Sequence, residues 1–269
     1  MEVKVVLLTG GSSGIGAETS HLLASAGMTV YSASRRGTID RPQEGIIPVV
    51  LDVNDAAGTE ALVNRIVREQ GRLDAVICNA GNGVFGQVEG TLEEEARAQF
   101  ETTFFGSFKT IQACLPVFRK QHFGRIVTIT SVMAVLQLPY QGLYSSAKAA
   151  LLSLYQSLSM ELRGSGIECC SILPGDVSTG FTAARKITRA GSDPDSPYKQ
   201  GMARNLRKIE HDEQNGMSPG VIGRAILKQL KRKHMAVRVI PRLDYRLVGM
   251  LVRIVPSKTA LYILSRLYN

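Results

Sequence analysis

Short apolar runs alternate with longer amphipathic stretches along most of the chain. The apolar runs have the length of buried strands, and the stretches between them have the apolar spacing of helices. The runs that predict strands cover residues 3–8, 29–33, 46–51, 73–78, 125–130, 167–173 and 237–240. Strands that are apolar on both faces and alternate with helices predict a doubly wound α/β fold, a parallel sheet with helices on both sides.

The predicted helices begin or bend at residues with known helix preferences. They cover residues 15–26, 54–70, a segment that opens at Thr91, 100–120, 143–163 and 219–231. Asn54 is placed to cap the second of these helices, and Thr91 with Glu94 has the spacing of a capping box. Pro116 should bend the long middle helix, because proline removes a backbone donor.

Two segments depart from this alternation. Residues 179–217 are rich in Gly, Asp, Pro, Ser, Arg and Lys, and they follow the carboxyl end of a strand, where open sheets bind ligands. We predict a substrate-binding loop there, with a mobile surface insertion as the alternative. Residues 245–269 form an apolar and basic tail, which predicts an amphipathic segment. Such a tail either contacts membrane lipid or packs over the substrate pocket or another subunit.

Composition narrows the class of protein. The chain has 269 residues, 44% of them hydrophobic, and no uninterrupted apolar run reaches the roughly 18 residues of a membrane span. Its N-terminus leads directly into a glycine-rich stretch, so we expect a first strand and not a signal peptide. The four cysteines lack the spacing of a disulfide or a zinc site. We therefore predict core cysteines, no metal, and a reducing cytoplasmic location.

The net charge of +9 comes from the C-terminal quarter of the chain. Residues 199–269 hold 15 Lys and Arg against 4 Asp and Glu, whereas residues 1–198 hold 17 against 19. A basic region of this kind can meet nucleic acid, anionic lipid or a negatively charged ligand. Because its basic residues are interleaved with apolar ones and no nucleic-acid module is present, we expect no nucleic-acid partner.

A glycine-rich segment lies between the first predicted strand and the first predicted helix. It contains Gly10, Gly14 and Gly16, which permit a sharp turn, a close phosphate and a helix packed against the sheet. The helix N-terminus then offers backbone N–H donors to a pyrophosphate. Glycine triplets are common, but the strand–turn–helix context favours a dinucleotide site.

The end of the second predicted strand selects between the two nicotinamide cofactors. An NAD site usually has Asp or Glu here to bind the ribose hydroxyl, whereas this chain has Ser34 followed by Arg35 and Arg36. A guanidinium pairs with the 2′-phosphate of NADP, which a carboxylate would repel. Two solvated arginines at a turn are the alternative. Asp52 is placed to accept from the adenine amino group, or to cap a helix.

A tyrosine and a lysine are four residues apart on a predicted helix. Tyr144 and Lys148 therefore lie on one helical face, where the ammonium is expected to lower the pKa of the phenol from about 10. That pairing produces an acid–base group that works near neutral pH. Ser131 ends the preceding strand, so the carboxyl edge of the sheet should bring all three side chains together.

Five ordered motifs resemble those of the short-chain dehydrogenase/reductase family over about residues 3–240. They are Thr9-Gly10-xxx-Gly14-x-Gly16, Asn79-Ala80-Gly81, Ser131, Tyr144-xxx-Lys148 and Pro174-Gly175-x-Val177-x-Thr179. The resemblance implies a single Rossmann-type domain over residues 1–244 and an oxidoreductase. Around residues 131–148 the chain is also similar to hydroxysteroid dehydrogenases.

The resemblance implies a role for each motif. Tyr144 would protonate the substrate oxygen as hydride arrives, Ser131 would hydrogen-bond that oxygen, and Lys148 would hold the nicotinamide ribose. The predicted NADP(H)-binding residues are Gly10, Ser12, Ser13, Gly14, Ile15, Gly16, Ser34, Arg35, Arg36, Asp52, Val53, Asn79, Ala80, Gly81, Tyr144, Lys148, Pro174, Gly175, Val177 and Thr179. The helices at 100–120 and 143–163 would form a homodimer or homotetramer.

One residue departs from the family pattern. The family usually has an Asn in an N-x-x-G sequence in the long middle helix, and this chain has Thr103 there. Thr103 has a shorter reach, so a water-linked proton relay to Lys148 is in question. The departure is the only support for an alternative function, a dinucleotide-binding protein with weak catalysis and a regulatory or membrane-peripheral role.

The residues around the predicted catalytic groups are apolar. Met133, Leu138 and Leu143, with Ser131 and Tyr144, form the predicted substrate site. No charged side chain near them would hold a carboxylate or a phosphate. We therefore expect a hydrophobic alcohol and its ketone or aldehyde, in the class of steroids, retinoids or lipids. Packing of these side chains into the core is the alternative.

Overall fold

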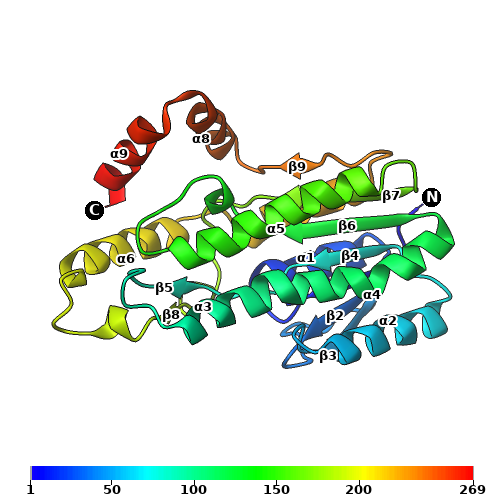
Figure 1. The fold of residues 1–269 in the computed structure, drawn as a ribbon. Coiled ribbons are helices and arrows are strands. Elements are labelled where there is room, and N and C mark those ends of the chain that lie inside the picture. The colour runs from blue at the N-terminus through cyan, green and yellow to red at the C-terminus, as the bar shows by residue number, and fades with distance from the viewer. Residues whose placement is uncertain (1, 269) are drawn as a thin grey trace.

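The computed structural model describes residues 2–268, apart from the side chains of Val252 and Arg253. Met1 and Asn269, the last residue of the predicted tail, lie outside this description. The main sheet is parallel and has the order β3-β2-β1-β4-β6-β7-β9 (Figure 1). Its strands are β1 (Val5–Thr9), β2 (Thr29–Ser34), β3 (Ile46–Val50), β4 (Ala75–Cys78), β6 (Gly124–Ile129), β7 (Ile167–Ile172) and β9 (Arg238–Val239). The predicted doubly wound fold is confirmed.

Helices cover both faces of this sheet. Along β1, Val5 and Leu7 point into one core, whereas Val6 and Leu8 point into the other. This double burial explains why β1 carries apolar side chains on both of its faces. Helices α1 (Gly14–Ser25) and α7 (Pro219–Leu230) pack together on one face, and α2 (Ala56–Gln70), α4 (Gly106–Gln121) and α5 (Gly142–Glu161) cover the other.

The predicted cysteine environment is also confirmed. Cys78, Cys114, Cys169 and Cys170 are all buried and carry free thiols. Burial raises the pKa of the Cys78 thiol to about 12, so it stays protonated and unreactive at neutral pH. These residues therefore act as small core side chains.

Two predicted helix starts are wrong by one residue. The N-cap of α2 is Asp55, whose carboxylate accepts from the backbone N–H of Gly58 at 3.0 Å, and not Asn54. The capping contact of α3 (Glu93–Phe100) joins the Leu92 N–H to the Glu95 carboxylate at 3.0 Å. The hydroxyl of Thr91 instead donates to the carbonyl of Gln87, which removes it from the predicted capping box.

The predicted continuous helix over 100–120 is interrupted by a π-helical segment, η1 (Glu101–Phe105). Pro116 was expected to cause the bend, yet it lies inside α4. The interruption instead occurs where Thr103 is fully buried among polar side chains. A wide turn at this point directs that polar group inward, and such turns are frequent at functional sites.

The predicted loop at 179–217 contains regular structure. β5 (Val84–Phe85) pairs with β8 (Lys186–Ile187), and a 3₁₀ turn, η3 (Ala190–Ser192), precedes the helix α6 (Lys199–Gln214). The sequence interpretation missed α6 because the segment is strongly charged. Its few apolar residues, Met202, Leu206 and Ile209, nevertheless have helical spacing, and they pack together with Phe85.

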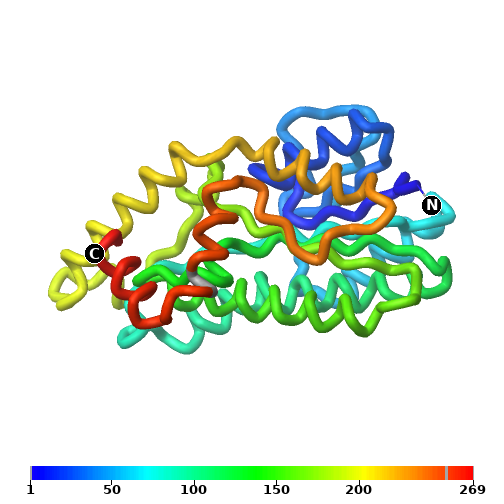
Figure 2. The backbone as a smooth tube through the Cα atoms, turned by 90° about the horizontal axis from the view of Figure 1, so that it is seen from above, coloured from blue at the N-terminus to red at the C-terminus, as the bar shows by residue number. Residues whose placement is uncertain are grey.

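The tail forms two helices, α8 (Leu243–Ile254) and α9 (Ser257–Tyr268). They return across the molecule toward the carboxyl edge of the sheet, beside α6 (Figures 1 and 2). Leu264 packs with the residues that follow β6, and the carbonyl of Tyr268 accepts from Asn205 on α6 at 2.7 Å. The tail is therefore fixed to the walls of the predicted substrate region.

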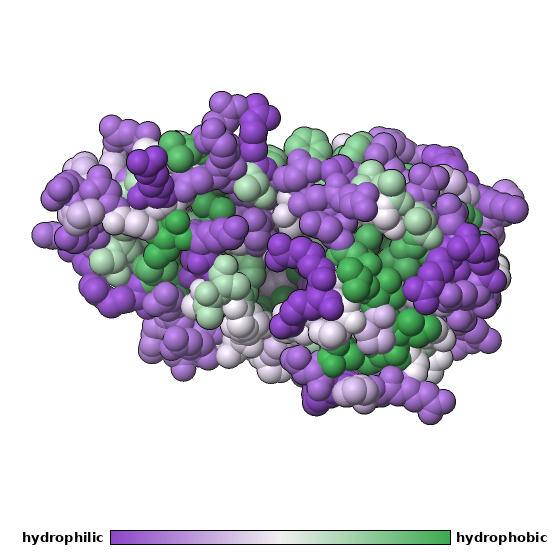
Figure 3. Space-filling view, turned by 90° about the horizontal axis from the view of Figure 1, so that it is seen from below, coloured by the Kyte–Doolittle hydropathy of each residue, from purple (hydrophilic) through white to green (hydrophobic). Residues whose placement is uncertain are grey.

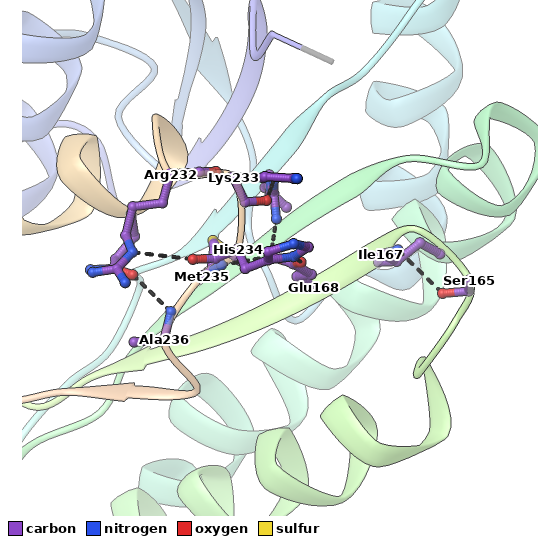
Figure 4. Close-up of polar contacts among 10 residues, drawn as sticks. Ser165, Ile167, Glu168, Arg232, Lys233, His234, Met235 and Ala236 are labelled. Carbon is purple, nitrogen blue, oxygen red and sulfur yellow. Dashed lines mark hydrogen bonds and ion pairs between the residues drawn. The ribbon is translucent and has the colours of Figure 1, made fainter.

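A polar cluster around Glu168 lies at the amino ends of the strands, on the edge of the sheet opposite to the carboxyl edge (Figure 4). Its carboxylate accepts from the backbone N–H of Met235 at 2.7 Å, contacts Nδ1 of His234 at 2.8 Å, and pairs with Arg125. The guanidinium of Arg125 also donates to the carbonyls of Arg232 and Lys233. These contacts join β6 and β7 to the segment that leads into β9.

Candidate active site

The predicted site residues follow the carboxyl ends of β1, β2, β3, β4, β6 and β7 or lie at the start of α5, and the strand order reverses between β1 and β4. In the space-filling view from below, the surface is hollowed near its middle, between the side that carries β2 and β3 and the side that carries α6 (Figure 3). Open parallel sheets bind ligands in this position.

The glycine turn is held by the end of β4. Asn79 donates from Nδ2 to the carbonyls of Thr9 at 3.1 Å and Gly10 at 3.0 Å. Gly10 has a φ of 71°, and a Cβ there would lie 2.9 Å from Cα of Ala80. The two predicted motifs are thus one unit, and only glycine fits at their contact.

The start of α1 has the features of a phosphate site. The N-cap Ser13 makes no side-chain capping bond, and the first turn of α1 contains no acidic residue. A Cβ at Gly14 would lie 3.3 Å from Cβ of Thr179, so the Pro174–Thr179 motif closes over the turn. The free N–H groups and the helix dipole suit a pyrophosphate, and these residues fit a dinucleotide.

The segment predicted to bind the cofactor ribose carries two cations. Arg35 and Arg36 are both exposed, and Arg36 donates from Nη2 to the carbonyl of Ser12 at 2.9 Å. Ser34 is buried and accepts from the N–H of Gly37 at 3.1 Å. The Arg36 guanidinium is therefore bound to the glycine turn, whereas the Arg35 side chain is exposed to solvent.

Two more predicted residues lie on the adenine side. The Asp52 carboxylate accepts from the N–H of Asn54 at 3.0 Å, so it serves a local turn and keeps its second oxygen for a ligand. Val53 is buried, and a Cβ at Gly106 would lie 2.6 Å from its Cγ2. Val53 therefore fixes the start of α4 beside the site.

The three predicted catalytic side chains come together. Ser131 follows β6 and accepts from the N–H of Met133 at 3.1 Å, and its hydroxyl also interacts with Tyr144. Lys148 donates from Nζ to the carbonyl of Ile129 at 2.8 Å, and this atom lies 5.8 Å from the centroid of the Tyr144 ring. The ammonium thus stands beside the phenol, as the four-residue spacing indicated.

The pKa values differ from the expectation for the tyrosine. Burial raises the pKa of Tyr144 to about 12, and the hydrogen bond with Ser131 offsets only part of this rise. The predicted lowering by Lys148 is therefore wrong for the cofactor-free chain, because desolvation is the larger effect. Burial also lowers the pKa of Lys148 to about 8. At neutral pH the phenol consequently keeps its proton.

A buried polar network surrounds Thr103, and the sequence interpretation missed two of its members. Gln99 donates from Nε2 to Oγ1 of Thr103 at 2.9 Å and accepts from the N–H of Val84 at 2.9 Å. The hydroxyl of Thr103 donates to Oδ1 of Asn82 at 3.2 Å. A Cβ at Gly81 would lie within 3.8 Å of both Thr103 Oγ1 and Lys148 Nζ. The spacing Gln99-xxx-Thr103 was the available signal.

The segment at 179–217 covers the tyrosine with an aromatic ring and an ion pair. Phe181 lies 5.9 Å from Tyr144 between ring centroids. Arg185 pairs with Glu213 on α6, and Thr182 donates to the same carboxylate at 2.6 Å. The pair fastens the beginning of the segment to its end. None of these residues was singled out from the sequence.

The tail contacts the segment predicted to line the nicotinamide. The hydroxyl of Tyr245 donates to the Asp176 carboxylate, and a Cβ at Gly175 would lie 2.2 Å from the Tyr245 ring. Among the predicted substrate residues, Met133, Leu138 and Leu143 are each partly exposed. Their neighbours Val132, Ala134 and Leu136 are buried in an apolar cluster with Leu173 and Leu152.

Comparison with known proteins agrees with this geometry. The sequence profile of the short chain dehydrogenase family matches residues 4–190. A 3-ketodihydrosphingosine reductase from Bacteroides thetaiotaomicron is 37% identical over 263 residues, which cover 96% of this chain and 93% of that protein.

Solved structures have the same architecture. A short-chain dehydrogenase from Streptomyces avermitilis is 27% identical and superposes with a TM-score of 0.84, over 99% of this chain and 98% of that one. A short chain dehydrogenase/reductase from Burkholderia phymatum, in complex with NAD, has a TM-score of 0.80 at 21% identity, over 94% of each chain. Other structures of this fold hold NADP.

Proposed function

The chain belongs to the short-chain dehydrogenase/reductase family of oxidoreductases, and on this premise we propose that it is an NADP(H)-dependent reductase of a long-chain, lipid-like ketone. The observation that carries the proposal is the convergence of Ser131, Tyr144 and Lys148 beside the glycine turn. An acid, a hydrogen-bond donor and a cation then lie together at the carboxyl edge of the sheet, next to the apolar segment 132–136.

Each of the three side chains has a distinct part in the proposed reaction. The bound cofactor would supply a hydride to the carbonyl carbon. Tyr144 donates its proton to the carbonyl oxygen, because its phenol, with a pKa raised to about 12, carries that proton at neutral pH. Ser131 donates a hydrogen bond to the same oxygen, and Lys148 binds ribose hydroxyls next to Tyr144. The product is the corresponding secondary alcohol.

The cofactor preference rests on charge. Ser34 stands where an NAD enzyme has a carboxylate, and Arg35 is exposed next to it. A 2′-phosphate gains a charge-assisted contact with the guanidinium and meets no repelling acid there. The same residues offer NAD no acceptor for both ribose hydroxyls. We therefore assign NADP(H), for which structures of the same fold provide precedent.

The substrate class rests on the apolar walls and on one relative. Met133, Leu138 and Leu143 are partly exposed and apolar, and Val132, Ala134 and Leu136 form a buried apolar cluster beneath them. The similar reductase from Bacteroides thetaiotaomicron is named for a long-chain ketone, 3-ketodihydrosphingosine. Lipid ketones therefore take precedence over the steroids and retinoids that the sequence also suggested.

We also propose a homodimer or homotetramer that uses the outer faces of α4 and α5. Phe105 and Met160 are exposed apolar side chains at these helices. Light scattering measures the assembly directly. A monomer at micromolar concentration would contradict this assignment without affecting the proposed reaction.

The decisive experiment measures NADPH oxidation with a panel of three ketones and one aldehyde. The panel contains 3-ketodihydrosphingosine, a steroid ketone, retinal and a small cyclic ketone. We expect the highest kcat/KM with the long-chain ketone, and a loss of at least about a hundredfold in kcat for Tyr144→Phe. NADPH binding to this variant, followed by fluorescence, should change little, because the phenol proton contributes to chemistry.

The result also tests the alternative function. If the wild-type chain binds NADPH and the variant turns over every ketone at the wild-type rate, Tyr144 is not the acid and the catalytic assignment fails. If no ketone is reduced by either chain, a dinucleotide-binding role without catalysis is the better description.

A further inference from the structure

The tail helix α8 presents its apolar side chains to solvent. Leu243, Leu247, Met250 and Ile254 recur at the spacing of one helical face, and each is exposed, Ile254 by 81% and Leu243 by 66%. An amphipathic helix of a globular protein normally turns such a face toward the core. In α8, these apolar side chains instead face solvent.

The opposite side of the tail is occupied by contacts with the proposed substrate site. Tyr245 lies against Gly175 and bonds to Asp176, and Leu264 joins the apolar cluster of Val132. Tyr268 packs with α6, where Lys208 Nζ lies 5.1 Å above its ring. The two helices are therefore fixed by one side, and the apolar face of α8 cannot turn inward without breaking these contacts.

Helix α9 extends the same surface. Leu261, Tyr262, Ile263 and Leu267 are exposed, and Arg266 lies 5.6 Å from the centroid of the Tyr262 ring. The exposed apolar side chains of α8 and α9 form what we call the tail surface. Its members are Leu243, Leu247, Val248, Met250, Leu251, Ile254, Leu261, Tyr262, Ile263 and Leu267.

Cations border the tail surface. Arg246, Lys258 and Arg266 are exposed on the same two helices, whereas Asp244 is paired with Arg242. The wider region, residues 199–269, holds 15 Lys and Arg against 4 Asp and Glu. Exposed apolar residues bordered by cations on a short helix are typical of segments that lie in a membrane interface.

We propose that the tail surface binds the surface of a membrane that contains anionic lipid. The apolar side chains enter the boundary between headgroups and acyl chains, while the cations meet lipid phosphates. The contact is peripheral, since none of the described helices is both long and apolar enough to cross a membrane. Charge selects this occupant over a second copy of the chain, because two tail surfaces would bring like charges together.

The proposal has a consequence for substrate entry, which rests on the proposed function. The tail surface and the substrate walls are opposite sides of the same two helices, joined through Tyr245 and Leu264. The hollow of Figure 3 lies on the face opposite to the tail, so the entry route we propose runs through solvent at the membrane surface. A docked chain would meet a long-chain ketone that leaves the bilayer at a higher local concentration than in bulk solution.

Vesicle sedimentation tests the binding step with the full chain and no turnover. The probes are vesicles of phosphatidylcholine alone and of phosphatidylcholine with phosphatidylglycerol. We expect binding to the anionic vesicles that weakens as salt is raised. Leu247→Gln/Ile254→Gln should reduce binding about tenfold or more, because two apolar side chains leave the interface. Arg246→Glu/Lys258→Glu should reduce binding to the anionic vesicles selectively.

The matched control is Val50→Gln/Val237→Gln. These side chains are 73% and 49% exposed, against 81% for Ile254 and 49% for Leu247, and they lie at the end of β3 and directly before β9. The control should bind vesicles as the wild type does. Equal binding by the control and the tail variant, or no binding by the wild type, overturns the proposal. A wild-type dimer that the tail variant converts to a monomer, without vesicle binding, also overturns it and assigns the surface to a second copy.

A kinetic measurement then separates this proposal from the proposed function. The tail variant should lose kcat/KM for a long-chain ketone embedded in anionic vesicles and keep it for a small water-soluble ketone. Loss with both ketones contradicts the entry route. If the wild type reduces no ketone, the proposed function fails, and the sedimentation result still decides membrane binding.

Discussion

At the scale of single residues, Lys148 shows how the proposed catalysis conflicts with stability. Its ammonium is buried, its one protein acceptor among the described residues is the Ile129 carbonyl, and burial lowers its pKa to about 8 from 10.5. Below pH 8 the folded chain therefore holds a charge that the unfolded chain would solvate at no cost. As pH rises from about 8 toward 10.5, the unfolded chain binds the additional proton, and stability increases.

Lys148→Met should therefore stabilise the cofactor-free chain while abolishing reduction. We expect the free energy of unfolding at pH 7 to rise by about 1–3 kcal/mol, less any loss from the unpaired Ile129 carbonyl. The advantage should shrink as pH approaches 10. Urea denaturation at several pH values measures it, and a variant less stable than the wild type at pH 7 would show that the hydrogen bond outweighs desolvation.

Arg35 makes a second prediction at this scale. Arg35→Ala should raise the KM for NADPH by roughly ten- to a hundredfold, the equivalent of a charge-assisted contact of about 1.5–3 kcal/mol. The KM for NADH should hardly change. Arg41→Ala is the matched control, because Arg41 is a nearby exposed arginine that pairs with Glu18 at 3.1 Å. An equal loss for both cofactors would refute a contact with the 2′-phosphate.

At the scale of elements, the π-helical segment η1 depends on one buried side chain. Gln99 satisfies the Val84 N–H, the Thr103 hydroxyl and the Asn82 carbonyl at once, all within 3.0 Å. Gln99→Leu keeps much of the volume, leaves the Val84 N–H and the Asn82 carbonyl without this partner, and leaves the Thr103 hydroxyl with only its bond to Asn82 among the described residues. We expect a loss of about 2–4 kcal/mol in the free energy of unfolding, measured by chemical denaturation.

Substitutions at Thr103 provide the control for this network. Thr103→Ser retains the hydroxyl and should stay close to wild type, whereas Thr103→Val should lose about 1–2 kcal/mol. If the valine variant is as stable as the serine variant, the hydroxyl is not a structural member of the network.

The elements also show what the sequence can predict. The order of strands and helices and the meeting of Ser131, Tyr144 and Lys148 follow from apolar periodicity and from helical spacing, which are local properties. Helix α6 and the partners of Thr103 were missed, because they depend on contacts between distant residues. Glu213 meets Arg185, and Tyr245 meets Asp176, only after the chain has folded. No local sequence pattern distinguishes these four residues from polar residues that are exposed to solvent.

At the scale of the whole molecule, stability and chemistry are separated across the sheet. The carboxyl edge holds the glycine turn and the proposed catalytic residues, whereas the Glu168 cluster lies at the start of β7 (Figure 4). There a single carboxylate fastens Arg125 of β6 and the backbone of Met235. The cluster therefore holds the last strand to the sheet from the edge opposite the proposed site.

Glu168→Gln tests this separation. Burial opposes ionisation of Glu168, but its contacts with Met235, His234 and Arg125 outweigh burial, and its pKa is lowered. A lowered carboxyl pKa contributes stability above the unfolded pKa of about 4.3, and this is lost as pH falls through the folded value. The variant leaves the charge of Arg125 without its carboxylate partner, so it should lose about 1–3 kcal/mol at pH 7 and less near pH 3. Thermal unfolding across this range measures the difference. The KM for NADPH should stay unchanged, and a parallel rise in that KM would mean that the two edges of the sheet are coupled.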